Sequence, residues 1–111
     1  MSSNFTVADT FDESAFSDEA IAIFGSRLPI LAENKGLLHV QIGDLASAIR
    51  GQKLPAKEVI EFLENCLTKK DASSEIENAL ATSFLTLDEA KDMKLPARIR
   101  AILEEQAERD T

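Results

Sequence analysis

Apolar residues recur three or four positions apart along most of the chain, the spacing that places side chains on one face of an α-helix. The first stripe follows Ser17, a residue type that caps helix N-termini, and Pro29 is expected to interrupt it because proline lacks an amide donor. Further helices are predicted over about 41–50, 55–68, 74–87 and 96–109, and Ser74 with Glu77 resembles a capping box. The inward-facing residues of these five helices are Ile21, Phe24, Leu28, Leu31, Ile42, Leu45, Ala46, Ile49, Val59, Ile60, Leu63, Cys66, Leu67, Ile76, Ala79, Leu80, Phe84, Leu87, Ile99, Ile102 and Leu103.

The helix pattern predicts an all-α protein of one domain. A length of 111 residues suits one domain, and the four glycines and three prolines are too few for a turn-rich β-sandwich or barrel. About five helices with short connections predict a single-domain bundle or a short superhelical stack. Residues 1–16 are polar with isolated Phe and Val residues, which predicts a mobile or loosely packed acidic segment. The expected division is therefore an N-terminal segment over 1–16 and a helical domain over 17–111.

The whole chain has a formal net charge of −8, and its negative charge is concentrated in the first quarter. No Lys or Arg precedes Arg27, whereas this stretch holds five acids, Asp9, Asp12, Glu13, Asp18 and Glu19, and four phenylalanines, Phe5, Phe11, Phe16 and Phe24. A second acidic row, Glu58, Glu61 and Glu64, follows the outer side of a predicted helix, and Glu58 and Glu61 have no Lys one turn later. This charge disfavours nucleic-acid phosphates and anionic membranes as partners and favours a basic protein, although a merely solvated face has the same pattern.

Few residues of the chain suit catalysis or metal binding. His39 and Cys66 are the only histidine and cysteine, and they allow a thiol nucleophile with an imidazole base as one interpretation. Cys66, however, lies on the predicted inner face of its helix, which favours a buried structural thiol. One His and one Cys cannot form a zinc site by themselves, and no nucleotide-binding or metalloprotease motif is present. The sequence therefore predicts a binding protein without catalytic residues, metal or cofactor.

Two further features concern nucleic acid and location. The basic connection over 50–57 allows a DNA-binding helix-turn-helix as an alternative, but the following helix is acidic where a recognition helix is basic. The chain shows no secretory signal, no apolar run long enough to span a membrane and no pair of cysteines. These observations predict a cytoplasmic protein that does not bind nucleic acid or membrane directly.

The order of motifs over residues 37–104 resembles that of a bacterial protein family. The motifs are Ile42-Gly43-Asp44-Leu45, Val59-Ile60-Glu61-Phe62-Leu63-Glu64, Glu77-Asn78-Ala79-Leu80-Ala81-Thr82-Ser83-Phe84-Leu85, Leu95-Pro96 and Ile102-Leu103. They are similar to those of the small, acidic, helical immunity proteins encoded beside polymorphic or contact-dependent toxins, although Thr86 stands where that family usually has a glutamate. The resemblance implies a cytosolic protein that binds and neutralises one cognate toxin, often a basic nuclease domain, and it implies no catalytic residue.

These features predict an immunity or inhibitor protein that binds a cognate basic toxin domain, with a nuclease expected, through an acidic surface. The alternative is a phage- or host-encoded regulatory inhibitor or adaptor that binds a basic face of a nucleic-acid enzyme. The predicted contact residues are Phe11, Asp12, Glu13, Phe16, Asp18, Glu19, Glu61 and Glu64, with Phe11 or Phe16 as an apolar anchor. Residues 5–16 either carry partner specificity or fold back on the bundle; the sequence leaves this choice and the oligomeric state open.

Overall fold

The computed structural model describes residues 11–69 and 72–109, and it confirms the predicted all-α fold. Within these ranges the chain forms six helices and no strand. The helices are α1 (Glu13–Phe24), α2 (Ile30–Glu33), α3 (Leu38–Arg50), α4 (Ala56–Leu67), α5 (Ser74–Ser83) and α6 (Ala97–Arg109). None of them is both long and apolar enough to cross a membrane.

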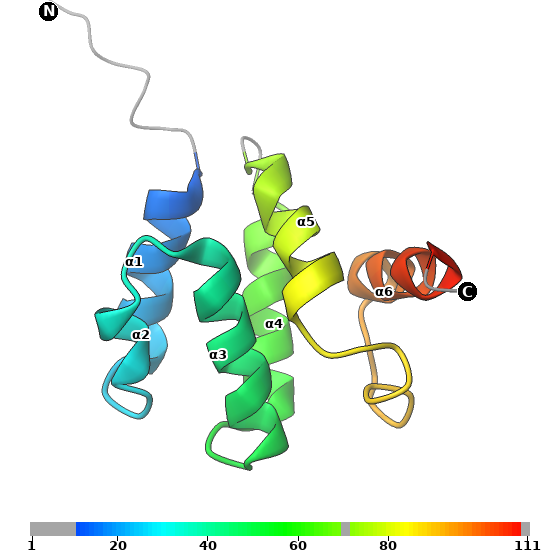
Figure 1. Cartoon of the computed structure of the whole chain (residues 1–111), viewed down its shortest axis with the longest axis horizontal. Coiled ribbons are helices and arrows are strands. Elements are labelled where there is room, and N and C mark those ends of the chain that lie inside the picture. The colour runs from blue at the N-terminus through cyan, green and yellow to red at the C-terminus, as the bar shows by residue number, and fades with distance from the viewer. Residues whose placement is uncertain (1–10, 70–71, 110–111) are drawn as a thin grey trace, which may run out of the picture.

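Helix α3 occupies the middle of the fold and joins its parts. It packs most extensively on α5 and also contacts α1, α2 and α4, whereas α6 packs against α5. Figure 1 shows α1 and α2 together on one side, α3 and α5 in the middle with α4 behind them, and α6 on the far side. The helices therefore form a compact stack in which α3 contacts helices before and after it in the chain.

Three phenylalanines fix α1 against α4. The ring of Phe62 on α4 lies 5.5 Å from Phe16 and 5.3 Å from Phe24, centroid to centroid, and its contact with Phe24 is edge to face. Aromatic pairs favour such tilted arrangements because the positive ring edge meets the negative face. Phe16 and Phe24 are fully buried, so this cluster forms the centre of the α1–α4 contact.

The first helix begins earlier than its sequence pattern predicts. Asp12, and not Ser17, is the N-cap of α1, because the Asp12 carboxylate accepts a 2.9 Å hydrogen bond from the amide of Ala15. Ser17 is buried in the middle of α1, where its Oγ accepts a hydrogen bond from the amide of Gly36. Gly36 has φ +82°, a left-handed conformation that suits glycine at the turn between α2 and α3. The expected boundary between residues 16 and 17 thus falls inside α1.

Phe11 and Phe16 belong to the protein core. Phe16 is 0% exposed and Phe11 is 8% exposed, so neither ring lies on the surface where the predicted apolar anchor would be. The carbonyl of Phe11 accepts a 2.9 Å hydrogen bond from the amide of Ser73, and the Lys69 ammonium lies 5.1 Å from the Phe11 ring centroid. This part of the acidic segment therefore folds back on the bundle; residues 1–10, with Phe5 and Asp9, lie outside the described ranges.

The remaining helices match the predicted pattern except at their ends. Pro29 does interrupt the first apolar stripe, and the short helix α2 after it makes six helices where about five are expected. Ser73, rather than Ser74, caps α5 by accepting a 3.2 Å hydrogen bond from the amide of Glu75. Helix α5 ends at Ser83, so Phe84 is buried beyond the helix and not within it.

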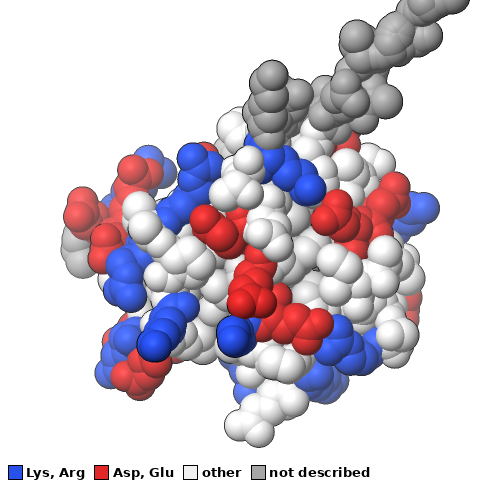
Figure 2. All heavy atoms as spheres, turned by 180° about the vertical axis from the view of Figure 1, so that it is seen from behind, with Lys and Arg blue, Asp and Glu red and all other residues white. Residues whose placement is uncertain are grey.

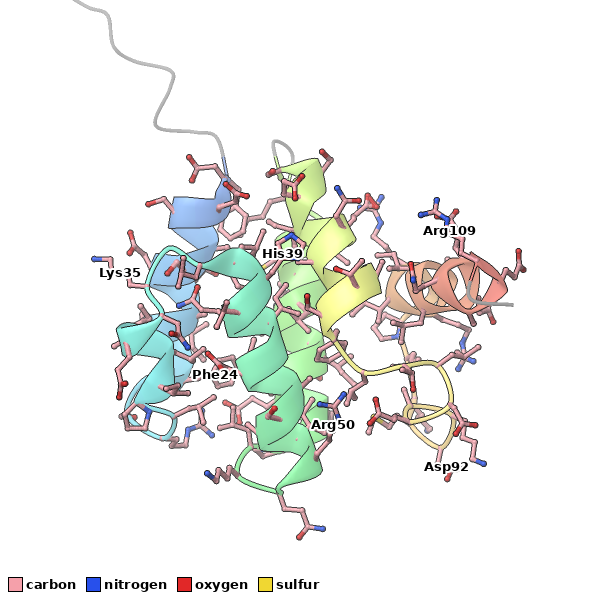
Figure 3. The ribbon with its side chains drawn as sticks, viewed as in Figure 1. Phe24, Lys35, His39, Arg50, Asp92 and Arg109 are labelled. Atoms are coloured by element: carbon pink, nitrogen blue, oxygen red, sulfur yellow. The ribbon has the colours of Figure 1, made fainter. Side chains whose placement is uncertain are left out.

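A bidentate ion pair ties the end of α3 to the turn after α5. Arg50 donates 2.7 and 3.0 Å hydrogen bonds to the Glu89 carboxylate. The same carboxylate accepts from the amide of Thr86, whose Oγ1 accepts from the amide of Glu89, as in a capping box. The Arg50 hydrogen bond and then the Thr86 amide lower the pKa of Glu89 from 4.5 to about 2. Arg50 points toward this turn in Figure 3.

This ion pair predicts an acid-dependent contribution to stability. Because the folded state lowers the pKa of Glu89, its contribution is complete above pH 4.5 and disappears as the pH falls toward 2. The free energy of unfolding should therefore differ between the native chain and Glu89→Gln at pH 7, and this difference should be much smaller at pH 2. Urea unfolding at both pH values measures this difference. A difference that does not change with pH would contradict this role.

Candidate functional site

Helices α1 and α4 pack together, and several carboxylates lie on the outer side of this pair. On α1, Glu19 and Ile23 are one helical turn apart, and Arg27 follows one turn later just after the helix. Arg27 reaches α4, where its two terminal nitrogens donate 3.0 and 2.7 Å hydrogen bonds to the Glu58 carboxylate. We call the exposed or half-buried residues Glu19, Ile23, Glu58, Glu61 and Glu64 the α1–α4 face.

Glu61 is the exposed carboxylate on the α4 side of this face. The buried residues of α4 occupy its opposite side, so the side chain of Glu61 points outward and is exposed. Within residues 11–69 and 72–109 it takes part in no hydrogen bond or ion pair, and the same is true of the Glu19 carboxylate. Figure 2 shows acidic side chains gathered in the middle of this view, with Lys and Arg mostly toward its left and lower edges. An uncompensated carboxylate at such a position can receive a cation from a partner at little desolvation cost.

The structure divides the predicted contact residues into separate regions. Glu19, Glu61 and Glu64 belong to the α1–α4 face, and Glu64 is half-buried with an Oε1 atom that has no hydrogen-bond partner in the described part of the chain. Asp12 caps α1 and Glu13 is exposed in its first turn, at the end of this helix. Asp18 points away toward Lys35, whose ammonium lies 3.8 Å from its carboxylate.

The acidic row on α4 is partly neutralised. The sequence suggests that Glu58 lacks a basic partner, but Arg27 supplies one from 31 residues earlier in the chain. Both hydrogen bonds with Arg27 lower the pKa of the Glu58 carboxyl and raise that of the guanidinium. Glu58 is therefore an ion-paired residue between α1 and α4, and Glu61 is the exposed carboxylate of the row.

One apolar residue of this face is absent from the predicted contacts. Ile23 is 41% exposed and lies four residues from both Glu19 and Arg27, one helical turn from each. Interfaces commonly combine an apolar contact with charged residues around it. The sequence does place Ile23 one helical turn after Glu19. This spacing puts it beside, and not within, the buried stripe of Phe16, Ala20 and Phe24.

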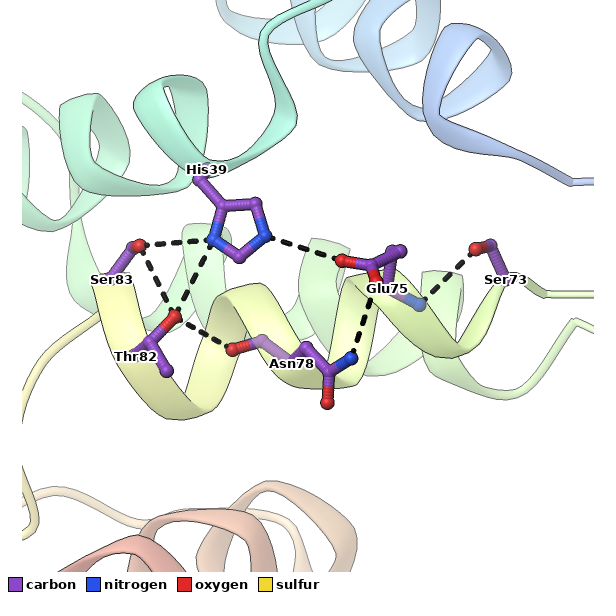
Figure 4. Close-up of polar contacts among 6 residues, drawn as sticks. All are labelled: His39, Ser73, Glu75, Asn78, Thr82 and Ser83. Carbon is purple, nitrogen blue, oxygen red and sulfur yellow. Dashed lines mark hydrogen bonds and ion pairs between the residues drawn. The ribbon is translucent and has the colours of Figure 1, made fainter.

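A second polar cluster lies on the opposite side of the molecule, between α3 and α5. The His39 ring on α3 has Nε2 3.4 Å from the Glu75 carboxylate and Nδ1 3.4 Å from the hydroxyl oxygens of Thr82 and Ser83. Figure 4 shows the ring lying across α5, and Figure 3 shows the position of His39 in the fold. The order acid, imidazole and hydroxyl has the arrangement of a hydrolytic triad, which the sequence alone does not reveal.

The position of Ser83 makes nucleophilic catalysis unfavourable there. Ser83 is the last residue of α5, where the helix dipole presents negative charge. An acyl-transfer site needs amide donors for the developing oxyanion, and a helix C-terminus offers carbonyl oxygens instead. Thr82 Oγ1 also donates a 2.9 Å hydrogen bond to the carbonyl of Asn78, one turn earlier. We therefore interpret the His39 cluster as a polar contact that holds α3 against α5.

Cys66 lies under the α1–α4 face and is fully buried. Burial, and secondarily the negative charge of Glu19, raise the pKa of its thiol to about 12, whereas Lys69 lowers it slightly. A thiol with this pKa is not ionised at neutral pH and is a poor nucleophile. His39 lies between α3 and α5, where its ring contacts Glu75, Thr82 and Ser83 and not Cys66.

The buried thiol predicts slow chemical labelling. Cys66 should not react with an aromatic disulfide reagent at pH 8 in the folded protein, and it should react fully once guanidinium unfolds the chain. Absorbance of the released thiolate measures both reactions. Rapid, complete labelling of a protein that keeps its native circular dichroism would contradict this burial.

Comparisons with known proteins found no matching family model, no matching curated protein and no matching solved structure. The resemblance to immunity proteins over residues 37–104 thus stays a prediction. Among the described residues no three His, Cys, Asp or Glu side chains lie close enough to hold a metal ion.

Proposed function

We propose that the protein is an immunity or inhibitor protein that binds and neutralises a basic toxin domain, with a nuclease as the expected target. The observation that carries the proposal is the pair of carboxylates Glu19 and Glu61, on helices that pack together, which lack an ion pair in the described ranges. Glu19 lies one helical turn from the exposed Ile23. A nuclease holds nucleic-acid phosphates with Lys and Arg side chains. Carboxylates presented to those side chains would occupy them and exclude the substrate.

The charge of the whole chain supports the same proposal. A net charge of −8 creates a field that attracts a basic protein over distances of about the Debye length, roughly 8 Å at physiological ionic strength. Association would therefore be fast and sensitive to salt, while the apolar contact at Ile23 would slow dissociation. Such a protein would act in the cytoplasm, where the nucleic-acid substrate of the toxin is found.

Co-expression tests the proposal. The product of the neighbouring gene, expressed alone, should stop bacterial growth, and co-expression of this chain should restore growth and yield a complex that co-purifies. A neighbouring product that neither binds nor is neutralised would defeat the immunity proposal. Capture of a basic nucleic-acid enzyme encoded elsewhere would instead favour the regulatory inhibitor.

A further inference from the structure

A groove opens between the first turns of α4 and the chain segment that precedes α6. Its volume is about 600 Å³, which lies in the range of small-molecule sites. Ile60 is buried in its α4 wall, and Met93, Leu95 and Pro96 are half-buried in the other wall. An aliphatic chain inserted here would remove apolar surface from water on both walls, so the groove suits an occupant with an apolar stem.

Two lysines determine the net charge of the groove. Lys57 lies on the α4 wall and Lys94 on the other wall, and both are exposed. Within residues 11–69 and 72–109 neither ammonium group takes part in an ion pair or hydrogen bond. Glu61 supplies the carboxylate of the lining, so two ammonium groups and one carboxylate leave one positive charge uncompensated. This balance favours a monoanion over a cation or a doubly charged phosphate.

The start of α4 adds to the positive potential of the groove. The N-cap of α4 is Pro55, and no side chain caps this end of the helix. Ala56 and Lys57, the first two residues of α4, line the groove, so the positive end of the helix dipole lies beside it. The acid of this first turn, Glu58, is held by Arg27 and does not line the groove. In a chain of net charge −8, an apolar groove is thus flanked by positive groups.

We propose that the groove binds a small aliphatic carboxylate, whose anionic end lies between Lys57 and Lys94. Its stem lies between Ile60 and Leu95. The inference is independent of the proposed function, because it concerns a free small molecule and not the partner protein. The lining gives the proposal a sign: loss of either lysine charge should weaken binding, and loss of the Glu61 charge should strengthen it. A cationic occupant would show the reverse pattern.

Titration of the full-length, ¹⁵N-labelled protein with hexanoate, hexanol and hexylammonium tests the proposal. Hexanoate should shift the backbone amide signals of Lys57, Ile60 and Leu95 in a saturable way, and it should bind more tightly than hexanol or hexylammonium. Lys57→Gln and Lys94→Gln should each weaken hexanoate binding roughly twofold to fivefold, as expected for loss of an exposed charge pair. Glu61→Gln should strengthen it by a similar factor.

Lys35→Gln is the matched control, because Lys35 is exposed in the turn between α2 and α3 and does not line the groove. It changes the net charge equally and should leave the affinity for hexanoate unchanged. Ala56→Leu, which fills the groove from the first residue of α4, should abolish binding while the circular dichroism stays native.

Four results would overturn the proposal. They are binding of hexanol or hexylammonium as tight as that of hexanoate, equal loss of affinity in Lys35→Gln and Lys57→Gln, undiminished binding to Ala56→Leu, and no shift of the groove signals by hexanoate. Each of them leaves the proposed function untouched, because the titration contains no partner protein.

Discussion

Removing residues 1–16 is expected to lower the free energy of unfolding by at least about 5 kcal/mol, because it deletes two buried phenylalanines and a helix cap. Phe16 packs on Phe62 in the aromatic cluster, and Phe11 is buried beside Lys69. A loss of this size is comparable to the whole stability of many small domains. Thermal and urea unfolding followed by circular dichroism should show a weak or absent cooperative transition.

A chain that begins at Phe11 provides the control for this truncation. It keeps Phe11, Phe16 and the Asp12 cap, so the difference between the two shortened chains isolates residues 11–16. If both shortened chains unfold at the same denaturant concentration, the contacts of Phe11 and Phe16 do not stabilise the fold. The comparison also matters for binding studies, since a partner lost on removing residues 1–16 would report unfolding and not a lost interface.

Reversing the charge of Glu19 and Glu61 together is expected to weaken binding of the basic partner about a hundredfold, since each reversal removes an attraction and adds a repulsion of about 1 kcal/mol or more. The salt dependence of the association rate should weaken as well, because the field that steers the partner is reduced. Surface plasmon resonance of Glu19→Lys/Glu61→Lys at several salt concentrations measures both effects.

Glu33→Lys/Glu104→Lys is the matched control for this pair. Both residues are exposed and lie on α2 and α6, away from the α1–α4 face, and the double replacement changes the net charge equally. The control should bind within a few-fold of the native chain. Equal loss of affinity in the two double variants would mean that the total charge, and not this face, governs binding.

The sequence predicts most of the helices because each buries a stripe at the helical period. Helices α3, α4 and α6 lie within a few residues of their expected ranges for this reason. The start of α1 could not be predicted in the same way. Asp12 and Ser17 are equally suitable caps, and only the tertiary contact of Ser17 with Gly36 shows that it belongs inside the helix.

The candidate site was less predictable because it depends on contacts between distant parts of the chain. The acidic composition identifies Glu19 and Glu61 as candidate contact residues, but no local pattern predicts that Arg27 pairs with Glu58. The burial of Phe16 also depends on a contact between distant parts of the chain. An aromatic residue in an acidic stretch resembles an interface anchor until the packing of α1 on α4 places it in the core.

Hydrogen exchange of the protein with and without its partner measures directly whether the α1–α4 face is the binding surface. We expect slower exchange on binding in the segments of α1 and α4 that carry Glu19, Ile23 and Glu61, with little change where His39 lies between α3 and α5. Protection confined to the His39 side of the molecule, or to α2, would contradict the assignment of the α1–α4 face as the binding surface.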